Sequence, residues 1–342
     1  MLRLAFVQGG MFVCLGVRAQ QVCLFPRDIG PVEWCLYHPL ERGRGEEIAY
    51  SIAHALLEDS LVREIRYIHS IRHEIRRAGP WILIRGVATP EGLYALFTAL
   101  RGAIERFPSR LSWGIPLRRD PEELSRFYRW VYEDTFEVER TVLALNRSFY
   151  QYWREGRLRI VLSGPSSSLL LRAARQLAEG GEGNFEYVPP AGPSSFYRPP
   201  RHGSGVVYVR WRLKVPPTLL DMMAIWAHIR ALLRYLCEER QLACQAVWVP
   251  LPIGLELWIQ TGLPWAALQA SQDFLSRPFV LPSHTSSLFF TWIYAPENTF
   301  LSTWWACVWG ISAFPKEIPS FSPRQLRQST QRWSITTFAV GE

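Results

Sequence analysis

Residues 61–106 read LVREIRYIHSIRHEIRRAGPWILIRGVATPEGLYALFTALRGAIER, and this stretch decides the fold. Its first part has apolar residues at helical spacing up to a Gly-Pro pair, which predicts a helix over residues 61–78. The compact apolar run at 81–87 predicts a strand. Thr89 is suited to cap a helix that has Pro90 in its first turn. The order of helix, strand and helix indicates an α/β layer with its own core.

The predicted helix carries two histidines, His69 and His73, four residues apart. Residues at this spacing share one helical face, and Glu64 and Glu74 lie close by in the sequence. Two histidines on one face with a nearby glutamate form the metal site of several zinc hydrolases. The stretch therefore raises the question of whether this helix binds zinc.

A similar order recurs in the second half of the chain. Residues 254–278, GLELWIQTGLPWAALQASQDFLSRP, predict a strand, a turn of small residues and a helix that begins at a proline. A chain of 342 residues is long enough for two domains. The self-similarity predicts two α/β units, each with its own core.

Two features of the sequence set the boundaries of these units: a point where the strand-helix pattern begins again, and a connector. A new strand begins at residue 157, and residues 180–205 are rich in Gly, Pro and Ser, which is typical of an exposed connector. We expect five segments: a signal peptide at 1–19, a first unit at 20–156, a strand, helix and connector leading into the second unit at 157–205, a second unit at 206–320, and a C-terminal tail at 321–342.

The N-terminus has the pattern of a secretory signal peptide. An arginine at position 3 precedes a mostly apolar run from Leu4 to Val17, and Ala19 is a small residue at the cleavage position. This predicts export to a bacterial periplasm or cell surface, with the mature chain beginning near Gln20. The alternative is an ordinary buried first strand, in which case the protein is cytoplasmic. No run reaches the roughly 18 apolar residues that a transmembrane helix needs.

The stretch at 61–106 resembles the α/β unit of the insulinase/pitrilysin metallopeptidase family, the inverzincins. A non-catalytic unit of that family reads L-x-x-x-[IL]-R-E-x-x-G-L-x-Y, followed by a strand and a helix that carries PE. Here Arg66 takes the place of the arginine, Ser70 that of the glycine and His73 that of the tyrosine. The segment from residue 158, LRIVLSGPSSSLLLRAARQLAEG, is similar to a later strand and helix of the same unit.

The resemblance covers residues 22–185 by motif and extends to about residue 310 by architecture. It implies an α+β fold of two insulinase-like α/β units, each a mostly antiparallel sheet packed with helices. The family uses four such units for a hollow clamshell, so this chain would form one half-clamshell.

The family's zinc chemistry uses H-x-x-E-H on a helix of the first unit and a distal glutamate. In HSIRH, Arg72 stands where the resemblance places the glutamate base, and arginine neither accepts a proton nor favours a cation nearby. The window AHALLEDS has His54 and Glu58 but no second histidine. Glu139 is conceivable as a distant third ligand of the two imidazoles.

These departures predict no catalytic residue, no metal and no cofactor. We expect a catalytically inactive insulinase-like protein that acts as a binding or partner subunit. The alternatives are an active zinc metallohydrolase that uses His69 and His73, and an exported structural or assembly scaffold.

Two groups of side chains are suited to bind a partner, because interfaces favour Trp, Tyr and Arg. The arginine run at 63–77 is interleaved with glutamates and the chain has only two lysines, which favours an acidic protein over nucleic acid. The aromatic run at 289–309 belongs in the core by default and in an interface as the second interpretation. The candidate partner surface comprises Arg63, Arg66, Arg72, Arg76, Trp292, Trp304, Trp305 and Trp309. The expected partner is a second copy in a homodimer, or an insulinase-like peptidase chain in a heterodimer.

The six cysteines include no CxxC pair, which argues against a cysteine zinc site. Cys237 and Cys244 lie seven residues apart, two helical turns, and we expect them to be core residues.

Overall fold

The computed structural model of the chain forms two compact units, Met1–Pro193 and Ser194–Glu342, here called unit 1 and unit 2. The structure describes residues 15–17, 20–27, 30–39, 46–110, 118, 120–121, 124, 127–128, 158–165, 167–178, 203–214, 217–282, 284–311, 314–315, 319 and 321–341.

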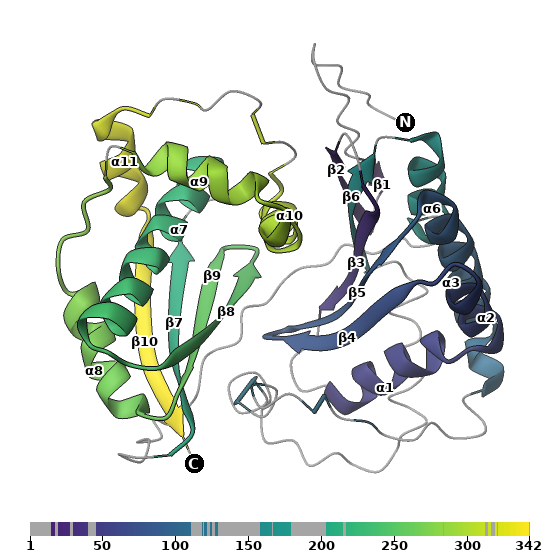
Figure 1. The fold of residues 1–342 in the computed structure, drawn as a ribbon, viewed down its shortest axis with the longest axis horizontal. Helices are drawn as coiled ribbons and strands as arrows, with labels where there is room; N and C mark the ends of the chain where they lie inside the picture. The colour runs from purple at the N-terminus through teal and green to yellow at the C-terminus, as the bar shows by residue number, and fades with distance from the viewer. Residues whose placement is uncertain are drawn as a thin grey trace. The chain divides into compact units, whose positions relative to one another are not determined.

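Unit 1 contains a six-stranded sheet in the order β1-β2-β6-β3-β5-β4 (Figure 1). All neighbouring strands are antiparallel except β2 and β6, which run parallel. The strands are β1 (Leu15–Val17), β2 (Gln20–Arg27), β3 (Val32–Pro39), β4 (Arg72–Ala78), β5 (Trp81–Ala88) and β6 (Arg159–Pro165).

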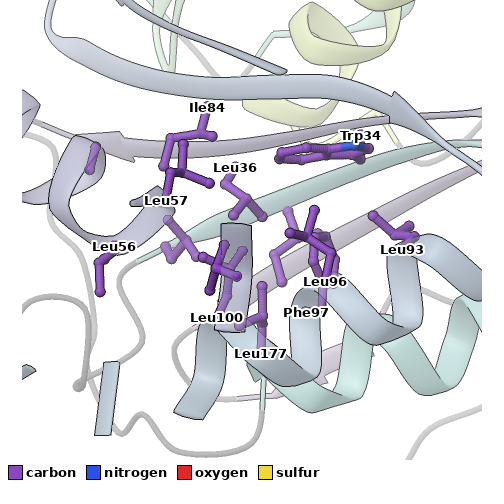
Figure 2. Close-up of a cluster of buried hydrophobic side chains, with 14 of the residues drawn as sticks. Trp34, Leu36, Leu56, Leu57, Ile84, Leu93, Leu96, Phe97, Leu100 and Leu177 are labelled. Atoms are coloured by element: carbon purple, nitrogen blue, oxygen red, sulfur yellow. The ribbon is translucent and has the colours of Figure 1, made fainter. Parts of the chain in front are cut away.

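The core of unit 1 lies between this sheet and the described helices, which pack their apolar faces on it. The helices are α1 (Glu46–Leu57), α2 (Ser60–Ile68), α3 (Pro90–Arg110) and α6 (Ser168–Ala178). Trp34 and Leu36 alternate along β3 and lie over Phe97 and Leu100 of α3, with Leu177 of α6 beside them (Figure 2). Burying each such side chain contributes about 1.5–3 kcal/mol.

The predicted helix over 61–78 is wrong in its second half. α2 ends at Ile68, Ser70 adopts a left-handed backbone with φ of 50°, and β4 begins at Arg72. The N–H of Ile71 donates to the carbonyl of Arg66 at 2.9 Å, which closes the helix end in the manner of a Schellman motif. The Gly-Pro pair then forms the turn of the β4–β5 hairpin.

Unit 2 contains a four-stranded antiparallel sheet in the order β10-β7-β9-β8. Its strands are β7 (Gly205–Leu213), β8 (Cys244–Leu251), β9 (Gly254–Thr261) and β10 (Trp333–Gly341). Its helices are α7 (Leu219–Arg234), the π-helical turn η2 (Tyr235–Glu239), α8 (Pro264–Leu275), α9 (Thr285–Tyr294), the 3-10 turn η3 (Pro296–Asn298), α10 (Thr299–Val308) and α11 (Pro323–Thr330).

The structure moves two of the expected boundaries. β6, placed by the sequence in a segment leading into the second unit, lies between β2 and β3 in the sheet of unit 1. The expected C-terminal tail at 321–342 contains α11 and β10, and β10 pairs with β7 along its whole length. Ser329 and Arg332 also bind the buried carboxylate of Asp221 near the start of α7, at 2.9 and 3.2 Å. Both corrections arise because strand pairing is long-range and leaves no local signal.

Some expectations fall on residues outside the described part of the chain. Residues 129–157, 179–202 and most of the expected signal peptide at 1–19 are among them. Residues 15–17 form β1, which pairs with β2; whether this segment is removed stays a prediction. Within the described ranges, no helix is long and apolar enough to span a membrane.

Candidate functional site

The two histidines that suggested a zinc helix lie on different elements. His69 is the C-terminal cap of α2, and His73 is the second residue of β4, opposite Gly86 of β5. Arg72 is an exposed strand residue, so its comparison with a helical base does not hold. The interpretation of His69 and His73 as a helical i, i+4 pair is therefore wrong.

His73 instead lies on the strand against which α1, the helix that carries His54, packs. Burial, and then the nearby charge of Arg66, lower the pKa of His73 to about 4, although Glu58 opposes the shift. His54 also acts on the pKa of His73, which places the two imidazoles within electrostatic reach of each other. Sequence reasoning missed this pair, because α1 and β4 meet only in three dimensions.

His54 lies in a similar environment. Its ring packs on Tyr50 with 4.6 Å between ring centroids, and its Nδ1 is 3.3 Å from a guanidinium nitrogen of Arg118. Burial, and then the charge of Arg118, lower the pKa of His54. Both imidazoles are thus neutral near pH 7. A neutral imidazole can bind a metal ion, but two guanidinium groups nearby oppose a cation.

The donor set around this histidine pair is incomplete among the described residues. No group of three or more His, Cys, Asp or Glu side chains in those ranges could hold a metal ion. Glu64 is an exposed residue of α2, and Glu139 lies outside the described residues. The pair therefore fits poorly to a site that requires three protein ligands.

The arginine run of the candidate partner surface is divided between α2 and β4, so the predicted arginine-rich helix does not exist. Arg63, Arg72 and Arg76 are exposed. Arg66 is partly buried and donates to the carbonyl of Leu57 at 3.0 Å, which satisfies the C-terminal end of α1.

Arg76 of this candidate surface, and the neighbouring Arg77 on β4, already have local partners. Arg76 pairs with Glu74 at 3.0 Å, and Glu74 also pairs with Arg85 on β5. Arg77 is buried, and its backbone N–H donates to Asp120 at 2.6 Å. Whether the exposed arginines bind a partner stays a prediction.

The tryptophans of the candidate partner surface are mostly core residues. Trp304, Trp305 and Trp309 are buried, so their proposed place on a partner surface is wrong. Trp305 contacts Trp309 edge to face at 5.3 Å, and the Trp309 indole N–H donates to the Leu251 carbonyl at 2.8 Å. α10 packs on β8, which explains the burial. Trp292 is partly buried.

Sequence reasoning missed an exposed apolar patch on α2. It comprises Leu61, Tyr67 and Ile68, which are 43, 87 and 60 % exposed. Only Val62 of this helix is buried. The sequence contained a signal for this patch. A nine-residue helix with this many large apolar residues has more of them than one buried face can cover. With Arg63, the patch has the composition of an interface.

Unit 2 also holds a buried ion pair that the sequence did not reveal. Glu256 on β9 is fully buried and lies opposite Arg210 on β7. Its carboxylate accepts hydrogen bonds from Arg210 at 2.7 and 2.9 Å, from the Tyr208 hydroxyl at 2.5 Å and from the Trp258 indole at 3.1 Å. A carboxylate satisfied by four donors positions strands rather than acting as a free acid or base.

The sequence matches no protein-family model and no curated protein. Solved structures nevertheless resemble the whole chain. The inactive domain of an M16 peptidase from Pseudomonas fluorescens matches with a TM-score of 0.57 and 11% identity, over 95% of this chain and 96% of that one.

Two further structures show the same similarity. A putative M16-like peptidase from Alicyclobacillus acidocaldarius matches with a TM-score of 0.54 and 12% identity, over 99 and 98% of the two chains. A chain of complex III from Candida albicans, with Inz-5 bound, matches at 0.55 and 9%, over 94 and 93%. Such low identities show the fold and not the activity. The chain therefore has the insulinase-like M16 peptidase fold, as the resemblance of residues 61–106 implied.

Proposed function

We propose that this chain is a catalytically inactive insulinase-like protein that acts as a binding or partner subunit. The observation that carries the proposal is the pair of neutral imidazoles, His54 and His73, which lie near Arg66 and Arg118 and belong to no group of three metal-binding side chains among the described residues. A catalytic zinc ion takes three protein ligands and one water molecule. Each arginine would instead repel the ion.

The metal content of the purified protein tests this proposal. We expect far less than one zinc per chain after dialysis against zinc and then buffer, and no cleavage of unstructured peptides. His54→Ala and His73→Ala should leave the zinc content unchanged, as should the control His69→Ala at the end of α2. One zinc per chain in the wild type and in His69→Ala, lost in the other two variants, would overturn the proposal.

The partner role is supported by the fold neighbours and by α2. One neighbour is described as an inactive domain, and another is a chain within a multisubunit complex. The exposed patch of Leu61, Tyr67 and Ile68 beside Arg63 offers apolar area with a basic flank. The net charge of +8 would make two copies repel each other. These features favour a different chain with acidic residues, of the same fold, over a homodimer.

Light scattering with candidate partners encoded by neighbouring genes tests the partner role. We expect a complex whose interface exceeds about 1,000 Å². Tyr67→Ser with Ile68→Ser should weaken it by more than about tenfold, because central aromatic residues dominate interfaces. The matched control is Leu288→Ser, an exposed apolar residue on α9 that is 45 % exposed. A monomer that binds none of these chains contradicts the proposal, and a stable homodimer replaces the acidic partner by a second copy.

We also propose export of the protein, supported by the sequence pattern of residues 1–19. The intact mass of the protein from its native source should correspond to a chain that begins near Gln20. A mass that includes residues 1–19 would instead indicate a cytoplasmic protein. That result would also rule out the alternative of an exported scaffold.

A further inference from the structure

Two free cysteines of unit 2 meet across a turn. Cys237 lies in η2, and Cys244 is the first residue of β8. Cys237 is exposed, Cys244 is partly exposed, and both are free thiols. The expectation that both are core residues is therefore wrong. The π-helical turn η2 ends the helical segment, and the chain then enters β8 at Cys244.

The backbone between them holds the two thiols together. The N–H groups of Arg240 and Leu242 donate to the carbonyls of Tyr235 and Leu236, each at 3.0 Å. Gln241 has a left-handed backbone with φ of 52° and reverses the chain. The turn is therefore fixed by its own hydrogen bonds and does not depend on a partner.

The side chains complete this arrangement. Cys237 lies close enough to Cys244 to raise the pKa of its thiol, and Thr261, opposite Cys244 on β9, acts in the other direction. Burial raises the pKa of the Cys244 thiol to about 11, and the adjacent Cys237 adds to the shift. The two thiols thus differ in exposure and in protonation. Cys237 is exposed to solvent, while Cys244 is partly buried and stays protonated.

We propose that Cys237 and Cys244 form a redox-active dithiol that small disulfide compounds oxidise to an intramolecular disulfide. The Cys237 thiolate attacks the external disulfide, forms a mixed disulfide and releases one thiol. Cys244 then loses its proton and attacks the Cys237 sulfur, which releases the second thiol. One external disulfide and two protein thiols become one protein disulfide and two small thiols, so the external disulfide accepts both electrons.

The proposal is independent of the proposed partner role, because it involves only the turn between η2 and β8. The disulfide would tie the end of the α7–η2 segment to the first residue of β8. An oxidising compartment would hold the pair as a disulfide, and a reducing one as a dithiol.

The test uses the full chain, reduced and then exposed to increasing oxidised glutathione. Remaining thiols are blocked with N-ethylmaleimide, and the protein is digested with trypsin, which cleaves after Arg240 between the two cysteines. We expect the peptide of residues 235–240 to appear joined to the peptide that begins at Gln241. We also expect the loss of the N-ethylmaleimide adducts on these two peptides, at Cys237 and Cys244.

Single variants separate the two steps. In Cys244→Ser the cross-linked peptide should be absent, and glutathione should accumulate on Cys237. In Cys237→Ser, reaction of Cys244 with oxidised glutathione should be at least tenfold slower than that of Cys237 in the wild type, because the Cys244 thiol is protonated. The control Cys35→Ser, at a buried cysteine of unit 1, should leave the cross-link unchanged. Circular dichroism of each variant establishes that it is folded.

Two results would overturn the proposal. Stable glutathione on Cys237 without the cross-linked peptide would show that Cys244 does not resolve the mixed disulfide. Equal reaction rates in the wild type and in Cys237→Ser would show that Cys237 is not the attacking thiol. Either outcome rejects the proposal.

Discussion

The two units have the same sheet and fill it differently. Strands β6-β3-β5-β4 of unit 1 and β10-β7-β9-β8 of unit 2 have the same order, and all neighbours within each set are antiparallel. In each unit a hairpin, β4–β5 or β8–β9, leads into a helix that begins at a proline, Pro90 or Pro264. Unit 1 adds β2 and β1 beyond β6, whereas the described sheet of unit 2 ends at β10.

The turns before the two hairpins explain why the topology is shared. Ser70 and Gln241 are the only non-glycine residues with positive φ in the described ranges. Each follows a helical segment and lies two or three positions before the first residue of the hairpin's first strand. The comparison teaches that backbone reversal at this point, not a particular side chain, directs the chain into the sheet.

The two cores, unlike the two sheets, differ: they are built from different residue types. The core of unit 1 is mostly Leu, Ile and Ala, whereas ten of the 15 tryptophans, those from Trp211 onward, belong to unit 2. Trp226, Trp248 and Trp305 contact other aromatic rings there. The aromatic excess that suggested an interface is largely the filling of a second core.

The largest expected effect concerns the cross-strand ion pairs of the two units. Glu256→Ala should destabilise unit 2 by about 3–5 kcal/mol, because Arg210 remains as a buried charge without its partner. The matched variant Glu74→Ala removes a half-exposed pair from unit 1 and should cost less than about 1 kcal/mol. Urea unfolding followed by tryptophan fluorescence, which reports mainly on unit 2, measures the first effect. Hydrogen exchange of β4 measures the second.

Equal costs at the two sites would contradict the comparison. They would show that Glu256 is solvated in solution, or that Glu74 is less exposed than the structure indicates. Glu256→Gln keeps the shape and an acceptor oxygen, so its cost should lie between those of the wild type and the alanine variant.

The sequence predicted the elements with strong local patterns and missed those defined by distant partners. The strand at 81–87 and the helix that begins at Pro90, with Thr89 as its cap, were confirmed. β4 was read as helix, because Ile71 and Ile75 are four residues apart and fit a helix as well as alternate positions of a strand. β10 was read as a tail, since its pairing with β7 has no local signal.

The candidate site was predicted less well, for the same reason. The proximity of His54 and His73 depends on how α1 packs on β4, and the burial of Trp304 depends on how α10 packs on β8. Neither packing follows from spacing along the chain. The resemblance to the insulinase fold was the most useful prediction, because it depended on a motif that included the turn at Ser70.

The second effect is a loss of stability in acid in both units. Burial lowers the pKa of His228 in unit 2 to about 4, and its ring is enclosed by Phe279 and Trp211. The unfolded chain binds a proton near pH 6.5 and the folded chain does not. Stability is therefore present above pH 6.5 and is lost as the pH falls toward 4, on the order of 3 kcal/mol. His73 acts in the same direction in unit 1.

Melting temperatures between pH 7 and 4 measure this effect. His228→Gln does not titrate, and its amide oxygen can accept the Trp211 N–H, so unit 2 should lose less stability in acid. His73→Gln should act likewise on unit 1, seen by hydrogen exchange. The control His284→Gln, at an exposed position, should keep the wild-type slope. An unchanged slope in His228→Gln would show that its ring is protonated in the folded protein.

The third effect concerns the two proline-started helices. Thr89 accepts the N–H of Gly92 at 3.1 Å, whereas Leu263 at the same place before α8 provides no side-chain acceptor. Thr89→Ala should cost about 1 kcal/mol. Leu263→Ser should stabilise unit 2 by a similar or smaller amount, because Leu263 is partly exposed and its loss removes little burial. Chemical denaturation of each variant measures both, and two losses would show that the helix starts are not equivalent.

The smallest effect tests the shared turn itself. A left-handed backbone costs about 1–2 kcal/mol for a residue with a side chain, and glycine avoids this cost but adds freedom to the unfolded chain. Ser70→Gly and Gln241→Gly should therefore each stabilise their own unit by about 0.5–1 kcal/mol. The matched controls are Ser60→Gly in α2 and Gln245→Gly in β8, which have ordinary backbone conformations and should each lose about 0.5–1 kcal/mol. Hydrogen exchange of β4 and β8 assigns each change to a unit. A gain at Ser70 with a loss at Gln241 would mean that only unit 1 uses the reversal where the insulinase motif has its glycine, and that unit 2 reaches the same sheet by a different turn.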